Sequence, residues 1–342
     1  MEGAAWCEDT VLRFRLPDPA HRLAGVRLHS SAFRADLEFH AGTGAWELRR
    51  DRPPLWRLEY RLELTHADGS REEVTAGELR CPDYVEPDWL DLPPVPGHWW
   101  SLDSARVWSP DAPTDRVLVA HDGPEYDRLG GLGRFAAIGD GRIPPFHLVL
   151  LTPSDRERRY SADPEYAREL ACETLPRIRA RLGGRPVVGA GVSLGALAML
   201  HAQWRHPEGF AGLFLQSGSF FRPELDGQES GFRYFRRIVR FTGTLHGASA
   251  NRTSNASASG ASNESANRAS NASANRRRAV PVTLTCGAAE ENLANNRALA
   301  GVLRERGYLV DLAENPDAHT WTGWRDALHP HLTRLLRQVW PD

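Results

Sequence analysis

The pentapeptide Gly191-Val192-Ser193-Leu194-Gly195 has the pattern G-x-S-x-G, which is typical of the turn around a nucleophilic serine. It follows an apolar run at residues 185–191 and opens a helix-forming run at residues 195–206. A serine at a sharp turn between a strand and a helix is lifted clear of the sheet, where its hydroxyl can attack a carbonyl carbon. The helix that follows offers the backbone N–H of Leu194 to the oxyanion that such an attack creates. The pattern therefore predicts Ser193 as a nucleophile.

A serine hydroxyl is a poor nucleophile until a base takes its proton, so the sequence after Ser193 must supply a histidine. His319 lies beyond the last apolar run, residues 308–314, and just before a helix expected at residues 326–339. Hydrolases with a nucleophile elbow place their histidine in such a loop, in the chain order serine, acid, histidine. His319 is therefore the predicted base.

The acid that orients this histidine should follow the apolar run at residues 280–286. Glu290 and Glu291 both stand there, shortly after Gly287. We prefer Glu290 because it stands three residues beyond the glycine that ends the strand. Glu291 remains an alternative, although it can equally serve as the N-terminal acid of a helix expected at residues 292–306.

A second oxyanion donor is expected from the loop after an early strand, residues 116–120. His121 and Asp122 stand at the end of that strand, and the backbone N–H of either residue can serve; we take His121 as the candidate. The alternative is a simple turn built on Asp122 and Gly123, which needs no catalytic role.

Short apolar runs alternate with helical stretches through residues 98–342, which predicts an α/β-hydrolase fold with a doubly wound, mostly parallel sheet. Residues 1–85 instead alternate apolar and polar residues between turn signals, which predicts a small β-sandwich. A proline-rich and acidic linker is expected at residues 86–97. Residues 247–278 are nearly all Ala, Ser, Asn, Gly and Arg, so we expect a disordered insert there.

The amino-acid composition limits which kinds of partner the chain is expected to bind. The formal net charge is −2, and the chain contains no lysine, so no excess basic patch exists for nucleic acid. No run of eighteen apolar residues predicts a membrane span, and the first residues do not resemble a signal peptide. We therefore expect a cytoplasmic protein that acts on a small molecule, with its oligomeric state left open. The four cysteines form no C-x-x-C pair, so no metal site is expected.

The chain resembles the enterochelin (ferric enterobactin) esterase family, which is related to esterase D and to the antigen 85 mycolyltransferases. The resemblance rests on HDGPEYDRLGGLG from residue 121, GAGVSLGALAMLHAQW from residue 189 with its trailing LQSGSFF, and CGAAEENLANNRALA from residue 286. PDAHTWTGWRDAL from residue 316 and the N-terminal sandwich complete it. The family's serine falls on Ser193, its histidine on His319 and its acid on Glu290.

The resemblance implies an esterase that opens ester bonds of a ferric tricatecholate siderophore through an acyl-enzyme and so releases iron in the cytoplasm. It implies no cofactor, because the iron arrives with the substrate. Arg158, Arg159, Tyr126 and Trp321 are the candidates for contact with an anionic aromatic ligand; the alternative is that they form an ordinary solvated rim. The alternatives are a general small-ester carboxylesterase, an acyltransferase of the same fold, and a non-catalytic binding protein that uses the sandwich.

Overall fold

The computed structural model describes residues 4–183, 186–254 and 279–341. The chain divides into two compact units. The first comprises Met1–Glu86 together with two short loops, Gly287–Glu290 and Glu314–Gly323. The second comprises Pro87–Cys286, Glu291–Ala313 and Trp324–Asp342. Loops from the C-terminal half of the chain thus belong to the same unit as the N-terminal residues, an arrangement that a linear domain boundary does not anticipate.

The first unit contains a β-sandwich of two four-stranded antiparallel sheets, with strand orders β1-β2-β6-β5 and β4-β3-β7-β8. Alternation places every second side chain inside, as with Leu12, Phe14 and Leu16 on β2. They pack in one core with Leu62 and Leu64 of β7. The strands are β1 (Ala4–Glu8), β2 (Val11–Pro17), β3 (Leu23–Ser30), β4 (Arg34–Asp36), β5 (Glu38–His40), β6 (Ala45–Asp51), β7 (Arg57–His66) and β8 (Arg71–Arg80).

The second unit is built on an eight-stranded sheet of order β16-β15-β14-β13-β11-β12-β10-β9. Strands β12, β11, β13, β14 and β15 run parallel to one another, whereas β10 pairs antiparallel with both β12 and β9. The parallel strands are mostly apolar, as expected for strands that helices cover on both faces. The strands are β9 (Gly97–Leu102), β10 (Ala105–Pro110), β11 (Val117–Ala120), β12 (His147–Leu150), β13 (Val187–Val192), β14 (Gly212–Gln216), β15 (Pro281–Gly287) and β16 (Leu309–Asn315).

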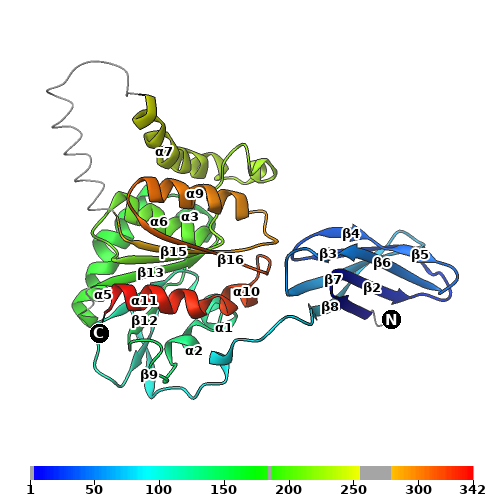
Figure 1. Ribbon diagram of the computed structural model, residues 1–342, viewed down its shortest axis with the longest axis horizontal. Helices are drawn as coiled ribbons and strands as arrows, with labels where there is room; N and C mark the ends of the chain where they lie inside the picture. The colour runs from blue at the N-terminus through cyan, green and yellow to red at the C-terminus, as the bar shows by residue number, and fades with distance from the viewer. Residues whose placement is uncertain (1–3, 184–185, 255–278, 342) are drawn as a thin grey trace. The chain divides into compact units, whose positions relative to one another are not determined.

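Helices lie on both faces of this sheet, with α6 and α9 on one side and α1, α2 and α11 on the other (Figure 1). No helix within the described ranges is long and apolar enough to cross a membrane. The helices are α1 (Gly123–Arg128), α2 (Leu132–Ala136), α3 (Arg156–Tyr160), α4 (Pro164–Glu169), α5 (Leu175–Leu182), α6 (Leu194–Arg205), α7 (Phe235–Ser254), α9 (Leu293–Glu305), α10 (Trp321–Asp326) and α11 (Thr333–Val339); short 3-10 or π turns are η1 (Asp88–Leu90), η2 (Leu170–Thr174), η3 (Gly227–Gly231) and η4 (Leu328–Leu332).

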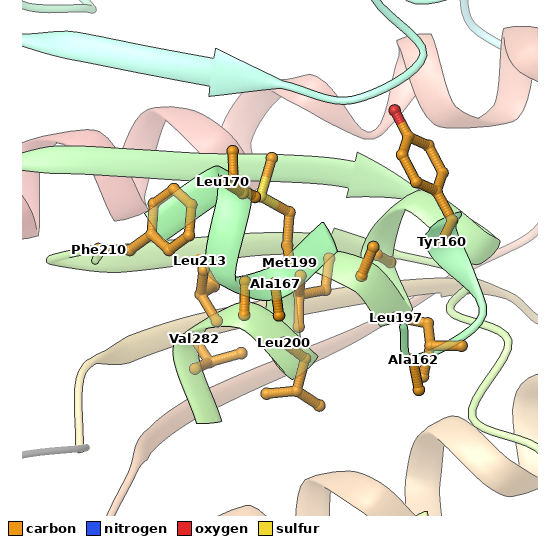
Figure 2. Close-up of a cluster of buried hydrophobic side chains, with 14 of the residues drawn as sticks. Tyr160, Ala162, Ala167, Leu170, Leu197, Met199, Leu200, Phe210, Leu213 and Val282 are labelled. Atoms are coloured by element: carbon orange, nitrogen blue, oxygen red, sulfur yellow. The ribbon is translucent and has the colours of Figure 1, made fainter. Parts of the chain in front are cut away.

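Helix α6 is the centre of the larger core. Figure 2 shows Leu197 and Leu200 of this helix in a cluster with Phe210, Leu213 of β14 and Val282 of β15. All these side chains are buried. Because α6 is apolar on nearly every side, it is held firmly, and the turn at its N-terminus is held with it.

The secondary structure departs from the sequence-based expectations in several places. Strands β9 and β10 were not predicted; they form a hairpin whose turn is made by Asp103 with a φ of 51°. The helix expected at residues 164–182 is interrupted by the π turn η2, so it is α4 and α5 in succession. Helix α7 continues to Ser254, so residues 247–254 of the expected disordered insert are helical, and residues 255–278 lie outside the described chain.

Candidate active site

Ser193 occupies a strained turn between β13 and α6. Its φ of 53° and ψ of −121° are conformations that non-glycine residues rarely adopt. The turn is possible because Gly191 and Gly195 cross closely: a Cβ on Gly191 would lie 2.5 Å from the carbonyl carbon of Gly195. The Ser193 N–H donates to the carbonyl of Gln216 on β14, at 2.9 Å. These constraints hold the serine at the N-terminus of α6.

Ser219 is a neighbour of Ser193 that the sequence did not single out. The two hydroxyl oxygens lie 3.2 Å apart, and the Ser219 N–H donates to the Ser193 carbonyl at 3.2 Å. Ser219 is buried and follows β14, within the motif LQSGSFF on which the family resemblance partly rests. That motif was the available signal, although nothing in its spacing predicted a contact with Ser193.

The turn after β11 lies against the start of α6. A Cβ on Gly195 would meet the His121 Cβ at 3.1 Å and a carboxylate oxygen of Asp122 at 3.2 Å. The His121 N–H donates to the carbonyl of Ala190, at 3.0 Å, which continues the pairing of β11 with β13. This bond counts against His121 as an oxyanion donor and favours Asp122, the other residue that the sequence left open.

Asp122 is fixed in place by an ion pair in which its own carboxylate is buried and the Arg156 side chain is partly exposed. Its two carboxylate oxygens each accept a hydrogen bond from the Arg156 guanidinium at 2.8 Å, and the residue is 2% exposed. Its φ of 52° turns the chain from β11 into α1. On the far side of the turn, the Gly123 N–H donates to the carbonyl of Leu151 at 2.9 Å. The backbone of Asp122 is therefore held in one conformation.

The side chain of His121 is buried and makes hydrogen bonds to two neighbouring helices. Its Nδ1 lies 2.9 Å from the Gly195 carbonyl, and its Nε2 lies 2.6 Å from the Tyr166 hydroxyl. A carbonyl only accepts, so Nδ1 carries the proton and Nε2 accepts from the tyrosine. Burial, assisted by the charges of Arg156 and Arg159, lowers the pKa of His121 to about 3. The ring is therefore neutral, and it ties α6 to α4.

Within the first unit, the side chains of His319 and Glu290 are joined by a hydrogen bond. The His319 Nδ1–H donates to a Glu290 carboxylate oxygen at 2.8 Å, and the other oxygen accepts from the Gly287 N–H at 2.8 Å. The Glu290 side chain is 1% exposed, whereas the ring of His319 is 37% exposed. The carboxylate of Glu290 therefore fixes the Nδ1 side of the imidazole, and part of the ring remains exposed.

Glu291, the alternative acid, lies elsewhere. Its carboxylate is 3.4 Å from the side-chain amide of Gln228, in the second unit. The residue is exposed and precedes α9. This position agrees with the role of a helix-flanking acid that the sequence allowed for Glu291.

The structure does not agree with all four of the expected ligand contacts. Tyr126 is fully buried, and its hydroxyl donates to the side-chain carbonyl of Gln216, so the prediction that it touches substrate is wrong. It is a core residue of α1, and burial raises its pKa. Arg159 is paired with Glu169 at 2.6 Å, which neutralises its charge. Arg158 is about half exposed, and its closest carboxylate oxygen, on Asp155, is 3.6 Å away.

Trp321 is half-buried and begins α10, two residues after His319. Its indole remains a candidate for contact with an aromatic ligand. Among the four expected contacts, Arg158 is thus more exposed than Arg159, and Trp321 keeps part of its surface exposed.

Solved structures of enterobactin esterases share this fold over nearly the whole chain, and another esterase shares it over part of the chain. The enterobactin esterase FES from Shigella flexneri, in the presence of 2,3-di-hydroxy-N-benzoyl-glycine, is 19% identical with a TM-score of 0.63, over 99% of this chain and 97% of that chain. The ferric enterobactin esterase from Salmonella typhimurium is 18% identical with a TM-score of 0.63, over 98% and 96%. A ferulic acid esterase is 16% identical with a TM-score of 0.50, over 69% and 92%.

At these identities the likeness establishes the fold. The prediction of an α/β-hydrolase fold preceded by a β-sandwich is confirmed, as is the resemblance to enterobactin esterases in overall architecture. No curated protein matches this chain in sequence. Residues 106–335 match the model of the family Esterase, described as "Putative esterase". Since this match spans more than half of the sequence, the chain belongs to the esterase family.

Proposed function

We propose that this chain is a serine esterase that hydrolyses carboxylic esters through an acyl-enzyme on Ser193. The observation that carries the proposal is the backbone of Ser193, because a non-glycine residue at φ 53° and ψ −121° stores strain. Such strain persists where it serves a purpose, and here it presents a hydroxyl at the N-terminus of a buried helix. A turn that only reversed the chain would accept glycine at this position.

In the proposed reaction, Ser193 Oγ attacks the carbonyl carbon of the ester while its proton passes to Nε2 of His319. Glu290 holds the opposite ring nitrogen and stabilises the imidazolium. The backbone N–H groups of Leu194 and Asp122 donate to the oxyanion. Collapse expels the alcohol, which takes the proton from His319. Water then attacks the acyl-enzyme by the same steps and regenerates Ser193.

The topology supports bringing these residues together. Strand β13 leads into Ser193, and β15 leads into the loop that carries Glu290. These strands run parallel, separated by β14. In open α/β sheets, functional residues gather beyond the carboxyl ends of the parallel strands.

The first test is hydrolysis of p-nitrophenyl acetate together with labelling by a fluorophosphonate probe. Ser193→Ala should abolish labelling and reduce kcat by several orders of magnitude. Ser154→Ala, at an exposed serine after β12, is the matched control and should behave as the parent. Labelling that persists in Ser193→Ala would refute the assignment of the nucleophile. A parent protein that neither turns over the ester nor labels would favour a binding role.

We further propose that the substrate is a catecholate siderophore of the enterobactin type, encountered in the cytoplasm. The support is the similarity to enterobactin esterases along almost the full length of both chains. The exposed guanidinium of Arg158 and the indole of Trp321 suit an anionic, aromatic ligand. No resident cofactor is needed, because iron would arrive bound to the substrate.

The substrate proposal predicts that kcat/KM is higher for a ferric or iron-free tricatecholate siderophore than for p-nitrophenyl acetate. Arg158→Met should raise KM for the ferric complex and weaken its dependence on salt, while turnover of the neutral ester stays unchanged. Preference for the neutral ester over every siderophore tested would end this assignment and leave the esterase. Product analysis with an added alcohol acceptor distinguishes hydrolysis from acyl transfer.

A further inference from the structure

The loop that carries His319 is anchored to the β-sandwich. Arg57, the first residue of β7, has no exposed side-chain surface. One of its terminal nitrogens donates to the carboxylate of Asp317 at 3.0 Å and to the hydroxyl of Thr320 at 3.0 Å. Its partners thus stand two residues before and one residue after His319. All four residues belong to the first unit.

The other partners of Arg57 lie within the sandwich. Its second terminal nitrogen donates to Glu78 of β8 at 2.6 Å. Burial alone would lower the pKa of Arg57, but the carboxylates of Asp317 and Glu78 outweigh this effect and raise it. The guanidinium is therefore a fixed charge that links two strands of the sandwich to the histidine loop.

Backbone contacts beside Arg57 fix the same loop. The N–H of Trp56 donates to the carbonyl of Pro316 at 2.7 Å. The Asp317 carboxylate also accepts from the Ala318 N–H at 2.8 Å, and the Thr320 hydroxyl accepts from the Gly323 N–H at 3.1 Å, at the start of α10. The chain on either side of His319 is thereby held by hydrogen bonds that converge on Arg57.

The loop that carries Glu290 is attached to the same structure. The Ala288 N–H donates to the Asn315 carbonyl at 2.7 Å, and the Ala289 N–H donates to the Asp317 carbonyl at 3.1 Å. Ala289 packs against the hydrophobic core of the sandwich. The sandwich therefore supports both partners of the Glu290–His319 hydrogen bond.

We propose that Arg57 is a positioning residue for catalysis: acting through Asp317 and Thr320, it holds the imidazole of His319 in the orientation that proton transfer requires. This proposal rests on the proposed role of His319 as the base. It gives the N-terminal sandwich a task in the chemical step. Small displacements of a catalytic group lower the rate strongly, so loss of this anchor should reduce kcat by roughly 10- to 100-fold.

The test compares Arg57→Met with Arg52→Met. Arg52 lies in the same unit and makes a bidentate ion pair with Asp83 at 2.7 and 2.9 Å. Within the described part of the chain, its hydrogen bonds go to Thr10, Cys7 and Asp83 and none reaches the histidine loop. Arg57→Met should lower kcat for p-nitrophenyl acetate roughly 10- to 100-fold, change KM less than about threefold and alter the pH profile of kcat. Arg52→Met should leave kcat and the pH profile as in the parent.

Arg57→Met leaves the Asp317 carboxylate buried beside an apolar side chain, which can impair folding. The double variant Arg57→Met/Asp317→Asn removes both charges and keeps the acceptor for the Ala318 N–H. It should regain thermal stability while kcat stays low. Recovery of kcat together with stability, or equal kcat in the Arg57 and Arg52 variants, would overturn the positioning role.

The two proposals fail in different ways. If Ser193→Ala and His319→Ala retain activity, the proposed esterase mechanism is wrong. If both abolish activity while Arg57→Met retains the kcat and pH profile of the parent, the mechanism stands and the positioning role of Arg57 is refuted.

Discussion

Replacing Glu290 with glutamine tests the orientation of His319 with almost no change in shape. One Glu290 oxygen accepts from the Gly287 N–H and the other from the His319 Nδ1–H, each at 2.8 Å. A glutamine side chain has one oxygen and one NH2 group. It can satisfy only one of these two donors, so the amide group must face either His319 or the N–H of Gly287.

If the amide oxygen stays with Gly287, the NH2 group faces Nδ1 of His319 and the ring must carry its proton on Nε2. That tautomer cannot accept a proton from Ser193. If the amide is reversed, its NH2 group opposes the Gly287 N–H and the loop is disturbed. We expect kcat to fall by about 10²- to 10⁴-fold, which corresponds to about 2.7–5.5 kcal/mol of activation free energy.

The assay is steady-state hydrolysis of p-nitrophenyl acetate, with kcat and KM determined separately. KM should hardly change, because Glu290 is 1% exposed and is not expected to touch substrate. Glu291→Gln is the matched control, since its carboxylate is exposed and lies beside Gln228. A large loss in Glu291→Gln with a mild effect in Glu290→Gln would move the role to Glu291. Mild effects in both would mean that Ser193 and His319 work largely without an acid.

Two further predictions concern the framework of the site. Gly191→Ala places a Cβ 2.5 Å from backbone atoms of Gly195 and should lower the free energy of unfolding by about 3 kcal/mol or more, measured by denaturant titration. The control is Gly301→Ala in α9, whose Cβ meets nothing within 4 Å and which should raise the free energy of unfolding by up to about 1 kcal/mol. Equal denaturation midpoints for the two variants would contradict the claim that Gly191 is too crowded for a Cβ. His121 has a pKa of about 3 when folded but near 6.5 when unfolded, so its contribution to stability falls by about 1.4 kcal/mol per unit as pH drops from 6.5 toward 3. His121→Gln should decline less steeply over that range, and parallel curves would refute this account.

Local patterns in the sequence predicted the central parallel strands and the turn at Ser193. The alternation on β2 and the apolar runs at β11 to β15 indicate which faces are buried, because the pattern of apolar residues along each strand is local to that strand. The glycines around Ser193 indicate a close crossing of strand and helix, because only residues without a Cβ fit there. These signals act over a few residues, which is why a single sequence contains them.

Contacts between distant residues were decided by the tertiary structure. The spacing of Glu290 and Glu291 cannot show which carboxylate reaches His319, since adjacent residues leave a turn in different directions. The position of Tyr126 in the sequence does not reveal that its hydroxyl is buried against Gln216. Arg57 and Asp317 are 260 residues apart, and no periodicity links them. Their pairing exists only because two loops from the C-terminal half of the chain fold onto the sandwich.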